Sequence, residues 1–134
     1  MITLYQISTT FNGIVVGTGN KVEDFGVGFF TKYGDGGVDI SPIGDLTKTE
    51  VRQMARELEI IEEILVAAPT DGLWDDDRTD EGQLGATYEE LEWAMEYKGT
   101  LIGLEPRQYD VFNIYNSFHN KNVHKMAMPP IFKK

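Results

Sequence analysis

The stretch Gly17–Asp45 reads GTGNKVEDFGVGFFTKYGDGGVDISPIGD, and it places carboxylates, lysines and a threonine among many glycines. It keeps neither the helical nor the strand period of a packed core element, so a loop-rich structure is predicted. The apolar triplet Ile14–Val16 directly precedes it and predicts a short buried strand. A strand that leads through a glycine-containing turn into a helix is where α/β sheets bind their ligands. We therefore expect the functional site to lie in this stretch.

The segments on either side of the strand carry weaker signals. Residues 2–11 have apolar side chains whose spacing fits a strand and a helix alike. Asn12 and Gly13 then give a turn signal. Beyond the strand and its turn, the glycine-dense segment 32–42 predicts irregular structure.

Helices are predicted for much of the remaining chain. Thr47–Glu50 and Thr87–Glu90 are capping boxes, in which a threonine and a glutamate cap the first helical turn reciprocally. Residues 62–68 predict a second short helix that Pro69 stops. Apolar residues at helical spacing support these helices and define a last one. They are Val51, Met54, Ala55 and Leu58 after the first box, Leu91 and Met95 after the second, and Val111, Ile114, Tyr115 and Phe118 in the last helix.

An acidic loop is predicted over residues 70–85, which contain glycine and lack apolar periodicity. A loop of this length in a compact domain is usually functional or disordered. No repeat or low-complexity segment divides the chain, and this loop is its one linker-like stretch. We therefore interpret residues 1–134 as a single domain that carries a long acidic loop.

Composition excludes several classes of protein. The chain has 134 residues, of which 41% are hydrophobic and 25% charged, enough for one domain with a core. Its net charge of −10 argues against a nucleic-acid partner, because binding nucleic acid normally needs a basic face. No apolar run approaches the roughly 20 residues that span a bilayer, and no secretion signal is seen. The absence of cysteine excludes disulfides and thiolate metal sites and fits a cytoplasmic location.

Several common functional motifs are absent from the sequence. No Gly-x-Gly-x-x-Gly follows a strand and no Walker A sequence occurs, which excludes the Rossmann and P-loop fingerprints. The acidic run Asp75–Glu81 does not fit an EF-hand, which needs glycine where Asp80 stands and glutamate where Ala86 stands. The two histidines, His119 and His124, are too few for a histidine zinc site, and neither accompanies a serine nucleophile elbow.

Groups that can handle anions and a divalent cation remain as the candidate site. Thr18, shortly after the strand, can donate to a phosphate or a ribose. Glu23 lies about one helical turn further and can hold Mg²⁺, which prefers hard carboxylate oxygens. Asp39 can accept a hydrogen bond from a ribose hydroxyl or an amide. The lysines that can neutralise phosphate oxygens are Lys32, Lys48 and Lys125.

Each of these residues alone also has a plainer interpretation. A single lysine or helical glutamate is usually a solvated surface residue. Thr18 can equally cap the following helix, and His124 next to Lys125 can be an exposed pair in the tail. The residue types by themselves therefore leave a nucleotide-binding site and an ordinary polar surface both open.

Longer matching words connect the chain with a known family. Nearly the whole chain, from about residue 4 to residue 130, resembles the C-terminal half of ammonia-dependent NAD synthetases. The matching words are Val16–Lys21, Phe30–Gly37, Gly44–Lys48, Ala68–Leu73, Thr79–Glu81, Leu84–Leu91 and the pair His124–Lys125. The resemblance implies an α/β fold related to the adenine nucleotide alpha-hydrolases, here as a helix-rich part with a short parallel sheet flanked by helices.

The resemblance also implies an activity. The family uses ATP to adenylate the nicotinate carboxylate of nicotinic acid adenine dinucleotide (deamido-NAD), and ammonia then displaces AMP to give NAD. At the matching positions, ATP would be bound by Thr18, Lys48 and Thr70, and Mg²⁺ by Glu23. Deamido-NAD would be bound by Lys32, Asp39, His124 and Lys125. The acidic segment from Leu73 to Gln83 matches a lid that closes over the site and excludes water.

One part of the family pattern is not found in this sequence. The Ser-Gly-Gly-x-Asp-Ser loop that grips the pyrophosphate of ATP would lie upstream of residue 1, as would an arginine that contacts the dinucleotide. We therefore expect this chain to associate with an N-terminal half, to form a homodimer or to be only marginally stable, since the shortened sheet exposes an edge. The chain has no cysteine for a glutaminase, so free ammonia is the expected nitrogen source. The alternative function is a non-catalytic fragment that binds the dinucleotide or another subunit.

Overall fold

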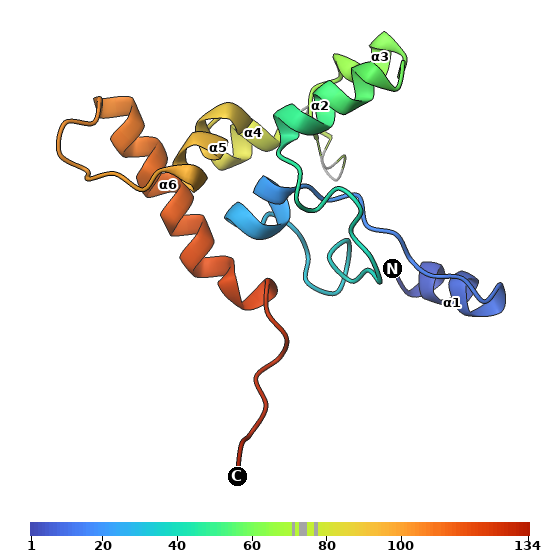
Figure 1. Cartoon of the computed structure of the whole chain (residues 1–134). Coiled ribbons are helices and arrows are strands. Elements are labelled where there is room, and N and C mark those ends of the chain that lie inside the picture. The colour runs from blue at the N-terminus through green and yellow to red at the C-terminus, as the bar shows by residue number, and fades with distance from the viewer. Residues whose placement is uncertain (71, 73–74, 77) are drawn as a thin grey trace.

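The computed structural model of the chain describes residues 1–70, 72, 75–76 and 78–134. Within these residues the regular structure is helical, and irregular segments join the helices (Figure 1). The elements in chain order are α1 (Ile2–Thr10), the π-helix η1 (Lys21–Val27), α2 (Lys48–Glu57), α3 (Glu62–Leu65), α4 (Asp80–Leu84), α5 (Tyr88–Glu96), α6 (Pro106–Asn122) and the 3-10 helix η2 (Val123–Lys125).

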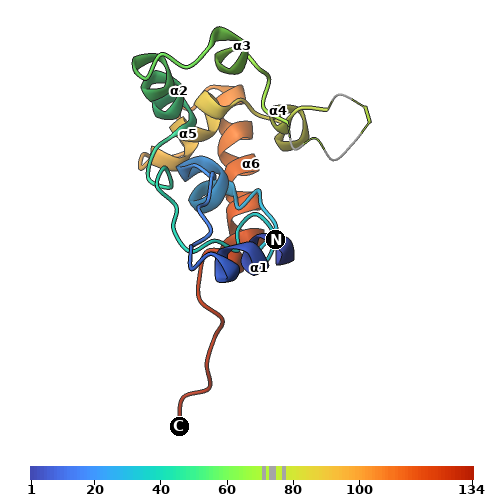
Figure 2. The same ribbon diagram turned by 90° about the vertical axis from the view of Figure 1, so that its right-hand side faces the viewer.

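The core lies where η1, α5 and α6 meet, and Figure 2 shows these three elements packed together. Tyr88, Leu91 and Ala94 are spaced three apart along α5, so their buried side chains lie on one helical face. Burial of this face against α6 and η1 removes apolar surface from water, the main source of folding free energy. The buried apolar cluster consists of Val22, Val27, Leu84, Ala86, Tyr88, Leu91, Ala94 and Val111.

Both predicted capping boxes are confirmed. The Thr47 hydroxyl accepts from the N–H of Glu50 at the start of α2, and Thr87 and Glu90 repeat the arrangement at the start of α5. The last predicted helix is also confirmed as α6, which begins at Pro106 because proline fits the first turn of a helix.

Two helix predictions need correction. The helix predicted over residues 62–68 is α3, which already ends at Leu65. The acidic loop predicted over residues 70–85 gives way to α4 at Asp80, because Thr79 caps that helix and Gly85, with φ 79°, ends it. The short α4 carries too few apolar residues for a periodic signal, so the sequence pattern missed it.

Residues 2–11, where strand and helix were both open, form the helix α1 followed by a turn. The hydroxyl of Tyr5 donates to the carbonyl of Gly37 and ties α1 to the glycine-dense segment. Most of the helix is nonetheless exposed, including Ile2 and Ile7. Figure 1 shows α1 lying apart from the α5–α6 core.

The predicted short parallel sheet is not confirmed. Among the described residues, the β pairing is an isolated parallel bridge between Val16 and Ile40. Val15 is buried, whereas Ile14 and Val16 are exposed by 59% and 52%, so the prediction of a buried strand holds for Val15 alone. Successive residues of an extended segment face opposite sides, and here one side lacks a covering element within the described chain.

The turn after this segment is closed by Asn20. Its side-chain oxygen accepts from the N–H groups of Val22 and Glu23, at 3.0 and 3.1 Å, and caps η1. Thr18 is exposed and is not the cap, which corrects that plainer interpretation of Thr18. At the other end of η1, Gly28 has φ 65°, a left-handed conformation that side chains disfavour.

The C-terminal tail has no helix over residues 128–134, and it runs away from the core (Figure 1). Its apolar residues Met128, Ile131 and Phe132 are exposed. None of the helices in the described part of the chain combines the length and apolar character needed to cross a membrane.

Candidate functional site

Glu23, Lys48 and Tyr88 form a cluster, named here the acid–base cluster, where the first turns of η1, α2 and α5 converge. The Lys48 Nζ atom lies 3.1 Å from Oε1 of Glu23. The Tyr88 hydroxyl donates to the same oxygen at 2.5 Å. The side chains of Lys48 and Glu23 are only 25% and 17% exposed. The structure thus brings together two of the predicted site residues that are 25 positions apart in the sequence.

The Tyr88 hydroxyl keeps its proton. Burial, and then the hydrogen bond to Glu23, raise the pKa of Tyr88, so its hydroxyl stays a donor. Lys48 also lies over the Tyr88 ring, 5.0 Å from its centroid, which places the ammonium against the electron-rich face. One carboxylate therefore faces one cationic and one neutral donor.

Asp24, the residue after Glu23, is half-buried beside the turn that leads into η1. Burial, and then the nearby charges of Glu23 and Asp35, raise the pKa of Asp24 to about 6. A side chain at Gly19 would place its Cβ 2.1 Å from the Asp24 carboxylate, so a larger residue there requires the Asp24 side chain to move.

Replacement Asp24→Asn should make the chain more stable at neutral pH. Because the pKa is raised on folding, Asp24 favours the folded state below the unfolded pKa of about 4 and loses that benefit as pH rises through about 6. The difference in melting temperature between the wild-type chain and the variant should therefore be smaller near pH 4.5 than at pH 7.5. Equal differences at both pH values, measured by thermal unfolding, would contradict this assignment.

The predicted dinucleotide ligands Lys32, His124 and Lys125 come together at the C-terminal end of α6. Lys125 Nζ donates to the carbonyls of Gly28 and Phe30, at 2.8 and 2.7 Å. In the opposite direction, Lys32 Nζ donates to the His124 carbonyl at 2.5 Å. Both ammonium groups thus bind backbone carbonyls, and burial lowers the pKa of Lys125. The His124 side chain itself is exposed.

Two further residues extend this contact along α6. Asn122, which is buried, donates to the Val27 carbonyl at 2.9 Å. His119 Nδ1 lies 2.7 Å from the Gly26 carbonyl, which fits a hydrogen bond with the proton on Nδ1. His119, Asn122 and Lys125 are three apart and lie on one face. We call these three residues the α6 ladder, because they bind successive carbonyls at the end of η1.

The variant Asn122→Ala should lower the free energy of unfolding by about 1–3 kcal/mol, because it leaves the buried Val27 carbonyl without its donor. Hydrogen exchange should accelerate at the Phe29 N–H, which bonds the Glu23 carbonyl across the same turn. Asn120→Ala is the matched control, since Asn120 is exposed on the same helix. Equal effects of the two variants in urea unfolding would show that the ladder does not hold this turn.

The other predicted residues lie apart from these contacts. Asp39 accepts from the Val15 N–H at 2.7 Å and so joins the two bridged segments. Thr18 is exposed. Thr70 donates to the Arg78 carbonyl at 3.2 Å, which helps to close the base of the acidic segment. The predicted lid over Leu73–Gln83 includes residues 73, 74 and 77, which lie outside the described residues.

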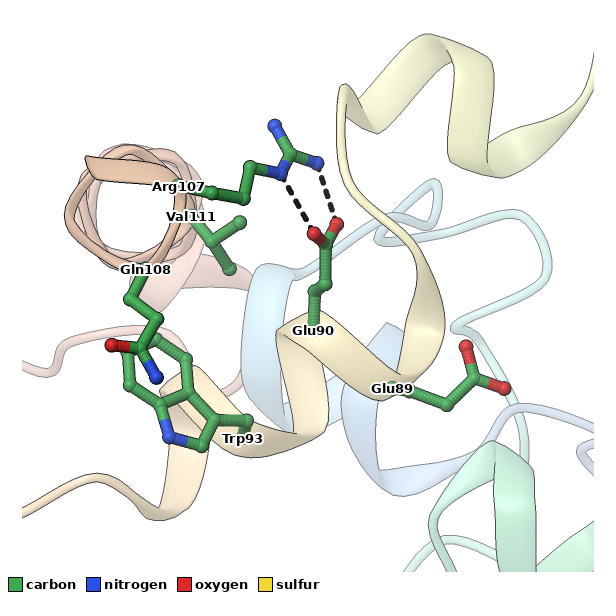
Figure 3. Close-up of a pocket in the computed structure, with 6 residues that line it drawn as sticks. All are labelled: Glu89, Glu90, Trp93, Arg107, Gln108 and Val111. Carbon is green, nitrogen blue, oxygen red and sulfur yellow. Dashed lines mark hydrogen bonds and ion pairs between the residues drawn. The ribbon is translucent and has the colours of Figure 1, made fainter. Parts of the chain in front are cut away.

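The most distinct cavity near α5 and α6 has a volume of about 260 Å³. Figure 3 shows Trp93 and Val111 lining it, with Arg107 bound to Glu90 at its rim. In that ion pair Nε and Nη2 of Arg107 donate to the two carboxylate oxygens of Glu90, at 2.7 and 2.5 Å. A second cavity of about 380 Å³ lies beside Lys21 and Phe25. The residues that line these two described cavities include none of the predicted site residues.

Sequence reasoning missed the residues that hold the site in place. Tyr88 follows a capping threonine, and nothing in its neighbourhood indicates a partner 65 positions away. For Asn122 and His119 the sequence does contain a signal. They lie three and six residues before Lys125 along a predicted helix, so all three share one helical face. Groups of three or more acidic or histidine side chains that could hold a metal do not occur among the described residues.

Comparison with known proteins gives consistent matches. The chain matches the family model named NAD synthase over residues 1–132. The NH(3)-dependent NAD(+) synthetase of Methanococcoides burtonii is 53% identical over 96 residues, 72% of this chain and 36% of that protein. The enzyme of the same name from Carboxydothermus hydrogenoformans is 39% identical over 132 residues, 98% of this chain and 50% of that protein. The chain thus spans about half the length of the latter relative.

Two solved structures share the fold. The NMN synthetase from Francisella tularensis superposes with a TM-score of 0.82 and 34% identity, covering 98% of this chain and 52% of that one. The NH3-dependent NAD synthetase from Campylobacter jejuni, in complex with the nitrate ion, gives a TM-score of 0.69 and 28% identity, covering 99% and 51%.

The partly buried acid–base cluster is a candidate ligand site, which would place the chain in the broad class of ligand-binding proteins. The family match, which extends over nearly the whole chain, identifies that class more closely. The chain belongs to the NAD synthase family.

Proposed function

We propose that this chain supplies the C-terminal part of an ammonia-dependent NAD synthetase. In that reaction a nicotinate carboxylate oxygen attacks the α-phosphorus of ATP and releases pyrophosphate. Ammonia then attacks the acyl carbon and expels AMP. The observation that carries the proposal is the close pair of Glu23 and Lys48, a carboxylate and an ammonium 3.1 Å apart in a partly buried place.

ATP and Mg²⁺ would meet at the acid–base cluster. Mg²⁺ is commonly held by one or two carboxylates together with substrate phosphates, so a single carboxylate such as Glu23 fits it. When bound, Mg²⁺ neutralises phosphate charge and polarises the phosphoryl oxygens. Lys48 would contact the phosphates, and Thr18 and Thr70 would contribute further polar contacts to ATP. Concentrating positive charge where pyrophosphate leaves lowers the barrier to adenylation.

The deamidated dinucleotide would lie against the end of α6. Lys32 and Lys125 are already gathered there, and their ammonium groups bind carbonyls that anionic phosphates can replace. His124 would complete this side of the site, and Asp39 would contact the dinucleotide from the bridged segment. The acidic segment that follows Thr70 would serve as a lid, because exclusion of water protects the acyl-adenylate from hydrolysis.

An N-terminal half would complete the enzyme. Ile14 and Val16 present exposed apolar side chains at the open edge of the isolated bridge, and an edge of this kind invites pairing with another segment. The Carboxydothermus hydrogenoformans relative is about twice as long as the region that it shares with this chain. The family pattern has its pyrophosphate loop upstream, so an N-terminal half is the proposed occupant. A second copy of the chain, giving a homodimer, is the competing occupant.

One comparison favours a second candidate substrate. Of the two superpositions reported above, the one with the higher TM-score is with a protein named NMN synthetase, so a deamidated mononucleotide is the second candidate acceptor. Purified chain, with and without an N-terminal half from a relative, should be given ATP, Mg²⁺, ammonia and each acceptor in turn. Faster amidation of the dinucleotide supports the proposal, and faster amidation of the mononucleotide would reassign the substrate.

The non-catalytic alternative is separated by the same assay. Turnover that appears only after the N-terminal half is added supports a part of an enzyme. Turnover by the chain alone would show that the upstream loop is dispensable. Absence of turnover in both mixtures, together with a melting temperature raised by deamido-NAD, would support a binding fragment, because a ligand that binds only the folded state must stabilise it.

A further inference from the structure

Tyr88 is an unusual residue for a purely packing role. It is the first residue of α5, and its side chain is fully buried in the core. Phenylalanine would fill the same space without a polar atom, and burying a hydroxyl costs free energy unless it is hydrogen-bonded. The hydroxyl lies 2.5 Å from Glu23 Oε1 and 3.4 Å from Asp80 Oδ2, so its one proton is directed to Glu23.

The two donors to Glu23 differ in what they can do. Lys48 reaches Oε1 with a flexible chain and a full positive charge, and the proposed function requires that charge at the ATP phosphates. Tyr88 is fixed by its buried ring and donates without adding charge. A neutral donor orients a carboxylate and leaves its negative charge available to a cation.

We propose that Tyr88 is a positioning residue for Glu23: its hydroxyl holds one carboxylate oxygen, so that the other can bind Mg²⁺ when Lys48 turns to the ATP phosphates. This inference rests on the proposed function. Without Tyr88, Lys48 is the donor that holds the carboxylate, and its departure toward ATP leaves Glu23 free to rotate. Tyr88 thereby links the buried core to the metal-binding side chain.

The test compares Tyr88→Phe with the wild-type chain, each mixed with an N-terminal half from a relative, in ATP binding measured by calorimetry with Mg²⁺ and with EDTA. In the wild type, Mg²⁺ should strengthen ATP binding. In the variant, the gain in ATP affinity on adding Mg²⁺ should be about tenfold smaller, which is the size expected for one hydrogen bond to a charged group. In EDTA the variant should bind ATP as the wild type does. Tyr97→Phe is the matched control, because it removes a hydroxyl that donates to the Thr100 carbonyl at the other end of α5.

The outcomes separate the inference from the proposed function. Equal Mg²⁺ dependence in Tyr88→Phe and Tyr97→Phe would overturn the role of Tyr88 and leave the proposed function standing. No effect of Mg²⁺ in the wild type would overturn both, and it is visible without any variant. Loss of ATP binding in EDTA as well would assign Tyr88 a structural role only.

A second measurement does not depend on the variant's folding. The buried hydroxyl proton of Tyr88 should exchange slowly with water and give its own proton NMR signal in the wild-type chain. That signal should shift on addition of Mg²⁺ together with ATP, because its acceptor then shares charge with a cation. A signal that stays unchanged when saturating Mg²⁺ and ATP are bound would overturn the inference.

Discussion

Leu91→Ala should lower the free energy of unfolding by about 2–5 kcal/mol. Leu91 is completely buried at the centre of α5, where it belongs to the cluster shared with η1 and α6. Truncation removes apolar surface that had been transferred from water and leaves a cavity in a close-packed region. Domains of this kind are stable by about 5–15 kcal/mol in total, so the loss is a large share. Urea unfolding followed by circular dichroism measures it.

Leu58→Ala provides the control for this prediction. Leu58 ends α2 and is 67% exposed, so its truncation should change stability by no more than about 0.5 kcal/mol. Equal losses in the two variants would mean that the α5 face is not the stabilising core. A folded state that survives Leu91→Ala unchanged would lead to the same conclusion.

Lys48→Met should weaken binding of ATP with Mg²⁺ by about 10–100-fold. The variant keeps the aliphatic stem against Tyr88 and removes the ammonium that lies 3.1 Å from Glu23. In an assay mixture that forms NAD, the rate of NAD formation should also fall, by about 10²–10³-fold, because charge stabilisation at the phosphates is lost. Calorimetry measures the binding, and NAD formation measures the rate.

Lys98→Ala is the comparison for Lys48→Met. Lys98 is exposed beyond the end of α5. Its replacement by alanine therefore changes the net charge by as much as Lys48→Met does, without touching the acid–base cluster. If both variants weaken ATP binding equally, the effect comes from the change in net charge, and the acid–base cluster is not the nucleotide site. Full activity in Lys48→Met would likewise remove Lys48 from the proposed phosphate contacts.

Signals confined to one helical turn were readable from the sequence. The capping boxes at Thr47 and Thr87 predicted the starts of α2 and α5, because the capping partners are only three residues apart. Apolar spacing likewise predicted α6. By contrast, the sequence pattern did not predict α4, because a helix of five residues is too short to show a periodic apolar spacing.

Residues 2–11 show where periodicity fails. Their apolar spacing fits a strand as well as a helix, and the structure forms α1. A helix satisfies its backbone hydrogen bonds within its own segment, whereas a strand needs a partner, and the described residues near α1 offer none. The same lack of a partner reduces the expected sheet to the bridge between Val16 and Ile40.

The site divides in the same way between sequence and structure. The sequence by itself determined the starts of α2 and α5, the glycine-dense segment and the family resemblance that singles out Glu23, Lys48 and Lys125. Only the tertiary structure decided that Tyr88 holds Glu23 and that the α6 ladder binds the end of η1. These partners are tens of residues apart, and burial and chain path select them, since a buried donor must find an acceptor wherever the fold places one.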